Sequence, residues 1–180
     1  MRGRLFTIVG PSGAGKDTLL SGAAAHCPDL VVVRRTITRP PEAGGEDFAS
    51  TTAADFAALR AAGAFALDWQ AHGLSYGIPA TELTPLDRGC DVIFNGSRAA
   101  LQRAATLFPG LIVLLVTAPA EILAKRLAAR GRESGTDIAA RLDRAAYDLP
   151  PGMARIEVVN DGTPAQGIAR LLAALQPVRG

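Results

Sequence analysis

One stretch, "LFTIVGPSGAGKDTLL" at residues 5–20, constrains the fold of this chain of 180 residues more than any other. An apolar run leads to Gly10, four residues separate it from Gly15 and Lys16, and a helix-like segment follows. Between a strand and a helix, this pattern surrounds phosphate oxygens with backbone N–H groups and the positive end of the helix dipole. The sequence therefore predicts ATP binding, with Lys16 reaching the phosphates as a catalytic residue. The predicted ATP-binding residues are Gly10, Pro11, Ser12, Gly13, Ala14, Gly15, Lys16, Asp17 and Thr18.

Asp17 stands where a Ser or Thr normally contacts Mg²⁺ in such a loop. An acidic residue in the first turn of a helix complements the helix dipole. A carboxylate beside a triphosphate would nevertheless repel it, so we expect Asp17 to be neutralised by Mg²⁺, directly or through water, or by Lys16. ATP and Mg²⁺ are the expected cofactors, and Asp17 is the candidate metal ligand.

Short apolar runs alternate with Ala- and Leu-rich stretches along the chain. The stretches at 119–131 and 163–176 have helical periodicity. Strands too apolar to face water indicate a parallel sheet covered on both sides. We therefore predict one α/β domain over residues 1–180, with a three-layer fold and a parallel central sheet. Its expected strands lie at 5–10, 30–35, 91–95, 111–116 and 155–159.

The composition argues against several other classes of protein. The formal net charge is only +2, so no block of positive charge indicates nucleic-acid binding. No apolar run approaches the ~20 residues of a membrane span, and the N-terminus lacks a signal-peptide core. Cys27 and Cys90 lie far apart, which favours two reduced thiols over a zinc site or a disulfide. We expect a soluble, cytoplasmic protein without a membrane partner, whose oligomeric state the sequence does not indicate.

Two polar stretches interrupt the alternation of strands and helices. Residues 34–50 are rich in Pro, Gly and charge and favour a functional loop, because connections in such folds are usually short. They begin a predicted acceptor-binding insertion at about 34–80. Residues 130–137 form a polar hinge between two expected Arg-bearing helices, which predicts a lid at about 130–145.

Arginines are the expected catalytic residues, because phosphoryl transfer depends mainly on alignment and on cations around the moving group. Arg130 and Arg141 flank the predicted hinge, and we expect them to act with Lys16 on the phosphates. Arg126 and Arg144 fit either the same role or a solvated helix face.

An anionic acceptor is predicted from the residues around the polar loop. Arg39 enters this loop from an apolar strand, and Tyr76 offers a hydroxyl group that is a good phosphate donor. His72 is a candidate general base, but we interpret it as structural, because an isolated histidine is more often structural and kinases of this architecture need no histidine. Trp69 is interpreted as a core residue, as are Phe56 and Phe65.

The phosphate loop, "TITRPPEAGGED", "GAFALDW", "YGIP" and "RLAARGRE" resemble the guanylate kinase superfamily across nearly the whole chain. The resemblance implies a P-loop kinase with a guanylate kinase-like fold, an acceptor-binding subdomain and a lid. Such a kinase moves the γ-phosphoryl group of ATP onto a phosphate.

The residues that read guanine in that superfamily are missing here. Guanylate kinases use a serine, a glutamate and an aspartate, and the matching positions hold Arg35, Leu67 and Asn95. Unmatched polar groups in a pocket are costly. The replacement of two carboxylates and the gain of a guanidinium therefore indicate a more anionic acceptor without a purine.

Five segments together, "GPSGAGKD", "ITRP", "AHGLSYGIP", "NGSR" and "RLAARGRE", resemble the ribose 1,5-bisphosphate phosphokinase family, which is associated with bacterial phosphonate breakdown. The resemblance implies that ATP and α-D-ribose 1,5-bisphosphate give ADP and 5-phospho-α-D-ribose 1-diphosphate, PRPP. The implied partners are thus two small molecules, ATP and a sugar bisphosphate. The aspartate in the phosphate loop fits this family.

A bisphosphate needs two cationic anchors. Arg39 with Tyr76 is the candidate for one phosphate, and Arg35 or Arg98 for the other. Two residues of "NGSR" could hydrogen-bond the ribose hydroxyls or the second phosphate, and its serine is also a candidate helix N-cap. The predicted substrate-binding residues are Arg35, Arg39, Tyr76, Asn95, Ser97 and Arg98.

The sequence leaves two alternative functions: a guanylate kinase with an unusual pocket, and a non-catalytic guanylate kinase-like binding module. Leu67 and Arg35 argue against the first. The second is disfavoured because the chain keeps Lys16 and the arginines Arg39, Arg130 and Arg141.

Overall fold

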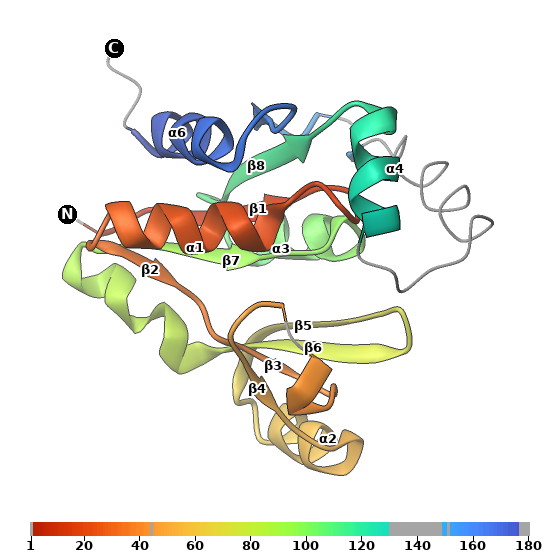
Figure 1. Ribbon diagram of the computed structural model, residues 1–180. Helices are drawn as coiled ribbons and strands as arrows, with labels where there is room; N and C mark the ends of the chain where they lie inside the picture. Colours follow the sequence, from red (N-terminus) through yellow and green to blue (C-terminus); the bar gives the residue numbers. More distant parts are fainter. Residues whose placement is uncertain (1, 44, 130–148, 151, 177–180) are drawn as a thin grey trace. The chain divides into compact units, whose positions relative to one another are not determined.

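The structure, a computed structural model, describes residues 2–43, 45–129, 149–150 and 152–176 (Figure 1). The chain divides into two compact units. The first unit contains Met1–Thr7 and Asp29–Leu111, and the second contains Ile8–Pro28 and Ile112–Gly180. The assignment of residues 1–180 to one domain stays a prediction.

Each of the five apolar runs contributes one strand to a five-stranded sheet of order β2-β7-β1-β8-β9. The strands β2 and β7 pair in parallel, as do β8 and β9. The predicted parallel central sheet is therefore confirmed. Its strands are β1 (Leu5–Val9), β2 (Leu30–Val32), β7 (Asp91–Asn95), β8 (Ile112–Thr117) and β9 (Arg155–Val159).

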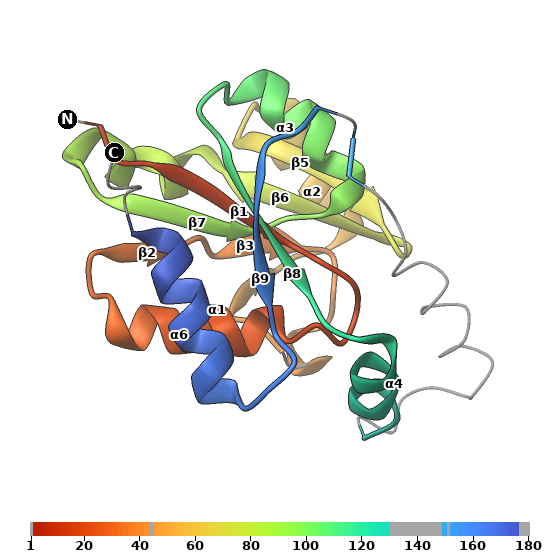
Figure 2. The ribbon, with the colours of Figure 1, turned by 90° about the horizontal axis from the view of Figure 1, so that it is seen from above.

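Three helices of the second unit fall where the phosphate-loop motif and the helical periodicity predict them. They are α1 (Lys16–His26), α4 (Ala120–Ala129) and α6 (Pro164–Leu175). The helix α6 lies beside α1 and packs against β9 (Figure 2). It begins with a capping box, in which Thr163 and Gln166 each bond the other's backbone N–H. These two hydrogen bonds stabilise the start of α6, next to the turn that joins it to β9.

A smaller sheet in the first unit, of order β4-β3-β6-β5, falls within the expected insertion range. In its hairpin (Figure 1), His72 and Gly73 form the two-residue turn with φ values of 51° and 73°, which is the type I′ geometry that hairpins favour. His72 therefore has a structural place at an exposed turn. The strands are β3 (Arg35–Ile37), β4 (Phe48–Ser50), β5 (Phe65–Ala71) and β6 (Leu74–Pro79).

Shorter helices complete the first unit. Thr52 caps α2 (Ala53–Ala61) by accepting a hydrogen bond from Asp55 N. The other helices are η1 (Pro41–Ala43), η2 (Ala80–Arg88), η3 (Arg98–Ala100) and α3 (Leu101–Leu107).

The core of the first unit contains the aromatic residues that the sequence suggests. Trp69 is 8% exposed and packs in a cluster with Leu67, Ile78 and Phe94. Phe56 is also buried, and its ring stacks on that of Phe65 at a centroid distance of 4.7 Å. The prediction that Trp69 and Phe56 are core residues is confirmed.

The predicted lid at about 130–145, with Arg130 and Arg141, lies outside the described residues. No helix in the described part of the chain has the length and apolar character needed to cross a membrane.

Candidate active site

The phosphate loop runs from the end of β1 to the start of α1, as predicted. Gly15 is the N-cap of α1 and has left-handed φ and ψ values of 88° and 19°. Gly13 also has a left-handed φ value, 84°. A residue with a side chain would be strained at either position. The loop therefore delivers its backbone to the N-terminus of an 11-residue helix, the arrangement that favours bound phosphate.

The loop packs closely against other parts of the second unit. A Cβ atom added at Gly13 would lie 3.2 Å from Leu127 Cγ of α4. One added at Gly15 would lie 2.6 Å from Asn160 Nδ2, just after β9. A side chain at Gly15 would therefore clash with Asn160, and one at Gly13 would be tight against Leu127, so the two glycines serve packing as well as conformation.

Lys16 is the first residue of α1, and its ammonium group folds back over the loop. Its Nζ atom donates to the carbonyl oxygens of Gly10, at 2.9 Å, and Pro11, at 3.2 Å. These are bonds that a bound phosphate could replace, because an ammonium group prefers an anionic acceptor.

Asp17 lies in the first turn of α1, where its charge complements the helix dipole. Within the described ranges, no group of three or more His, Cys, Asp or Glu side chains could hold a metal ion. Magnesium keeps several waters and is commonly bound through one carboxylate and substrate phosphates. The residues present therefore fit Mg²⁺ bound with ATP, and the role of Asp17 as its ligand stays a prediction.

Sequence reasoning missed Asn160, which follows β9 and is 4% exposed. Its Nδ2 atom donates to the carbonyl oxygen of Ala14 in the phosphate loop at 2.7 Å. The backbone carbonyl oxygen of Asn160 accepts a hydrogen bond from Arg126 Nη1 at 2.9 Å. Arg126 thus bonds the backbone of the turn after β9. The sequence predicts for it either a role on the phosphates or a place on a solvated helix face, and neither includes this bond. An asparagine after an apolar strand is typical of a turn, and this signal alone does not reveal a contact with the loop.

Arg35 lies at the start of β3 and is 6% exposed. Its Nε atom donates to Glu46 Oε2 at 2.9 Å, its Nη2 atom pairs with the other carboxylate oxygen, and its Nη1 atom donates to Asn95 O at 2.8 Å. Glu46 therefore balances the charge of Arg35 and engages two of the five N–H donors of a guanidinium. Sequence reasoning missed Glu46, although it lies in the polar loop.

Two aromatic rings line the same guanidinium. Its central carbon lies 5.0 Å from the ring centroid of Tyr76 and 5.7 Å from that of Trp69. The two rings stack on each other at 5.4 Å with an interplanar angle of 5°. Burial raises the pKa of Tyr76, against the opposing effect of the Arg35 and Arg39 charges. The hydroxyl is therefore protonated at neutral pH and can donate to an anion.

The other predicted acceptor residues lie in the first unit as well. The guanidinium of Arg39 lies 4.1 Å from the ring centroid of Phe48. Asn95 ends β7 and is 7% exposed. Ser97 accepts from Ala99 N at 3.3 Å as the N-cap of η3, so the predicted N-cap is confirmed. Arg98 is the first residue of η3. The substrate-binding roles of these residues stay predictions.

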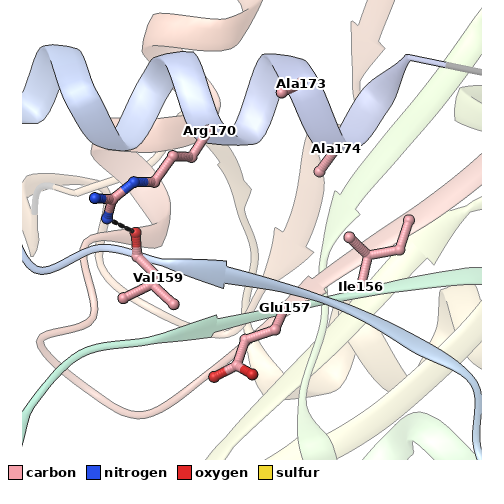
Figure 3. Close-up of a pocket in the computed structure, with 6 residues that line it drawn as sticks. All are labelled: Ile156, Glu157, Val159, Arg170, Ala173 and Ala174. Carbon is pink, nitrogen blue, oxygen red and sulfur yellow. Dashed lines mark hydrogen bonds between the residues drawn. The ribbon is translucent and has the colours of Figure 1, made fainter.

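A depression of about 550 Å³ lies between β9 and α6, and its described lining contains none of the predicted site residues (Figure 3). Arg170 crosses it to donate to the carbonyl oxygen of Val159 at 2.5 Å. Its lining residues are Ile156, Glu157, Val159, Arg170, Ala173 and Ala174.

The parallel sheet, the left-handed glycines and the loop at a helix N-terminus define a P-loop nucleotide-binding α/β protein. A family model described as an AAA domain matches residues 5–148. The chain superposes on the crystal structure of guanylate kinase from Anaplasma phagocytophilum with a TM-score of 0.70 and 19% identity, covering 97% of this chain and 85% of that one. The predicted guanylate kinase-like fold is confirmed.

Two relatives match almost from end to end. One, from Rhizobium etli, is named ribose 1,5-bisphosphate phosphokinase PhnN and is 47% identical over 177 residues, which cover 97% of this chain and 90% of that protein. A protein of the same name from Agrobacterium fabrum is 44% identical over 179 residues, covering 98% of each chain. The chain belongs to the AAA domain family and to the ribose 1,5-bisphosphate phosphokinase family. The resemblance to that family is therefore confirmed.

The chain also matches part of larger proteins. It is 46% identical over 175 residues to the bifunctional ribose 1,5-bisphosphokinase-thymidine phosphorylase of Cupriavidus necator, and this match covers 97% of the chain. The chain spans only 29% of the length of that relative, and 25% of the similarly named protein from Azorhizobium caulinodans.

Proposed function

We propose that this chain transfers the γ-phosphoryl group of ATP to α-D-ribose 1,5-bisphosphate, giving ADP and PRPP. The observation that carries the proposal is the sequence identity of 44–47%, over nearly the whole chain, to proteins named ribose 1,5-bisphosphate phosphokinase. An oxygen of the acceptor's 1-phosphate forms the new bond to the γ-phosphorus, and the bond to the β-phosphate oxygen breaks. A cytoplasmic location and a role in phosphonate breakdown are part of the same proposal.

ATP would bind at the phosphate loop, where backbone N–H groups and the start of α1 favour phosphate oxygens. Lys16 would exchange its two carbonyl partners for the phosphates and stabilise the charge on the transferring group. Asp17 would hold Mg²⁺, which neutralises phosphate charge when bound. Arg130 and Arg141 would complete the cationic environment of the γ-phosphate.

The acceptor would bind to residues of the first unit. Arg39 and the protonated hydroxyl of Tyr76 would hold one phosphate, and Arg35 or Arg98 the other. Because Glu46 balances the charge of Arg35, this guanidinium would recognise the acceptor through its remaining N–H donors more than through net charge. Asn95 and Ser97 would contact the ribose or the second phosphate.

A coupled ADP-release assay tests the proposal. The purified protein receives Mg·ATP with either ribose 1,5-bisphosphate or GMP, and we expect turnover with the sugar bisphosphate alone. Turnover with GMP alone would mean that the acceptor is misassigned. No turnover together with no nucleotide binding would support a non-catalytic module.

A further inference from the structure

The side chain and backbone of Asn160 join three segments of the second unit. The side-chain Nδ2 atom donates to the phosphate loop at Ala14 O, 2.7 Å away. The backbone N donates to Thr117 O at the end of β8, also at 2.7 Å, and the backbone O accepts from Arg126 of α4. The backbone N–H and C=O groups of Asn160 are therefore both hydrogen-bonded, while its side-chain amide bonds the phosphate loop.

Two glycines from distant parts of the sequence make room for this amide. A Cβ atom at Gly15 would lie 2.6 Å from Asn160 Nδ2, and one at Gly167 would lie 2.3 Å from Asn160 Oδ1 and 2.8 Å from Leu19 Cδ2 of α1. Gly167 lies inside α6, where glycine costs roughly 0.5–1 kcal/mol relative to alanine. The helix thus carries a glycine at a position where a Cβ atom would contact both the amide oxygen and Leu19.

The Oδ1 atom of Asn160 is buried and has no hydrogen-bond partner in the described part of the chain. A buried acceptor without a partner costs about 1–3 kcal/mol. An apolar residue at this position would avoid that cost. The retention of the amide therefore points to its donor group, which bonds the carbonyl oxygen of Ala14.

That carbonyl controls a neighbouring donor of the loop. The C=O of Ala14 and the N–H of Gly15 belong to one planar trans peptide unit, in which the two groups point in opposite directions. Holding the carbonyl oxygen on one side therefore sets the direction of the Gly15 N–H on the other. This N–H is one of the backbone donors at the start of α1.

We propose that Asn160 is a positioning residue for ATP, which fixes the orientation of the Ala14–Gly15 peptide, and that Gly167 keeps the space this requires. The inference rests on the proposed function only in taking the loop as the ATP site. It assigns no direct contact between Asn160 and ATP.

The test measures Mg·ATP binding by calorimetry with no acceptor present. We expect Asn160→Ala to bind ATP about tenfold more weakly than the unsubstituted protein, the scale of one lost hydrogen bond. Asn160→Asp keeps the size of the side chain but replaces the donor with a carboxylate oxygen facing Ala14 O, and we expect at least the same loss. In turnover, KM for ATP should rise while KM for the acceptor stays unchanged.

Gly167→Ala supplies a sharper test, because this change inside a helix ordinarily stabilises a protein. Here we expect it to displace the amide and to weaken ATP binding about as much as Asn160→Ala does. In the Asn160→Ala background it should cause no further loss, because the group that it displaces is absent. Additive losses in the double variant would overturn the inference.

Gly22→Ala is the matched control. Gly22 is also a helical glycine where α1 meets α6, but the three atoms nearest to its added Cβ all belong to the side chain of Ile168, with Cδ1 at 2.2 Å. Its melting temperature reports helix packing, and its ATP affinity should equal that of the unsubstituted protein. Weakening equal to that of Gly167→Ala would reduce the effect to packing and overturn the inference.

The measurement separates the two proposals. If the unsubstituted protein binds no Mg·ATP, both fall. If it binds Mg·ATP and the two Asn160 variants bind it equally well, only the role of Asn160 falls.

Discussion

The phosphate loop and the smaller sheet prepare for anions by different means. The loop relies on its backbone, with left-handed glycines, a helix N-terminus and one buried amide. The smaller sheet relies on side chains, with a buried Arg35–Glu46 pair, a stacked Trp69–Tyr76 pair and Arg39 against Phe48. Substitutions near the loop should therefore affect chemistry more than folding, and substitutions in the sheet should affect folding as well.

The largest effect is expected from Glu46→Ala. The side chains of Arg35 and Glu46 are 7% and 14% exposed, so the change leaves a buried guanidinium without its counter-charge. Removing one partner of a buried ion pair costs about 3–5 kcal/mol. The free energy of unfolding, measured with denaturant, should fall by about that amount.

The neighbouring residue gives the control for this prediction. Asp47 pairs with Arg34 at 3.0 Å, but their side chains are 82% and 54% exposed. Exposed pairs contribute about 0–1 kcal/mol, so Asp47→Ala should change stability little. Equal losses for Asp47→Ala and Glu46→Ala would contradict the view that burial makes the Arg35–Glu46 pair critical.

Lys16→Ala should have the next largest effect, and on the reaction alone. Removing one preorganised donor to a transition-state charge commonly lowers kcat by about 10²–10³, or roughly 2.7–4 kcal/mol. Its bonds to the carbonyl oxygens of Gly10 and Pro11 lie within the phosphate loop rather than in the hydrophobic core, so the melting temperature should change little. The steady-state ADP-release assay and thermal unfolding together check both parts.

The control for Lys16 is Lys125→Ala, which removes the same charge from an exposed position on α4. We expect its kcat to remain near that of the unsubstituted protein. A kcat for Lys16→Ala close to that of Lys125→Ala would exclude the loop as the site of phosphoryl transfer.

The difference between the two regions also explains what the sequence could predict. The residues of the phosphate loop are contiguous in the sequence, and the five strands are apolar runs, so local sequence patterns are enough to predict both. The Arg35–Glu46 pair joins residues 11 apart across a loop, and the Asn160–Ala14 bond joins residues 146 apart. Their pairing depends on tertiary packing, which neither periodicity nor motif spacing reports.

The same reasoning applies to Arg126. Its place on a helix was predictable from periodicity, and its charge follows from its residue type. Its bond to the carbonyl of Asn160 was not, because the carbonyl belongs to a turn 34 residues later in the chain. Sequence patterns locate an arginine on an element, and packing decides its partner.

Tyr76→Phe should separate acceptor binding from folding within the smaller sheet. The ring and its stacking on Trp69 are kept, while the hydroxyl is lost. A hydrogen bond to a charged group contributes about 1.5–3 kcal/mol, so kcat/KM for the acceptor should fall about 10–100-fold. The affinity for Mg·ATP should stay the same, and an equal loss for both substrates would contradict the assignment of Tyr76 to the acceptor.

The pH dependence of Tyr76 follows from its raised pKa. A group whose pKa is raised by folding contributes stability below its unfolded pKa and loses this contribution as pH rises through the folded value. Acceptor binding through the hydroxyl should likewise persist at neutral pH and decline only in alkali, because a tyrosinate cannot donate. Tyr76→Phe should lack this alkaline decline.

The smallest effect is expected from Asp161→Asn, which removes an exposed ion pair from the unit that carries the phosphate loop. Asp161 Oδ1 lies 2.6 Å from Arg170 Nη1, with side chains 42% and 45% exposed. The hydrogen bond from Arg170 lowers the pKa of Asp161. A lowered pKa means that the carboxylate contributes stability above its unfolded pKa and loses this contribution as pH falls through the folded value.

The melting temperatures of Asp161→Asn and the unsubstituted protein should therefore differ slightly at neutral pH and converge in acid. The difference should also shrink at high salt, because exposed charges are screened by solvent ions. A gap that persists in acid would show that the residue stabilises the β9–α6 turn without its charge. A gap as large as that of Glu46→Ala would remove the contrast between the exposed pair and the buried one, since burial would then not decide the strength of either.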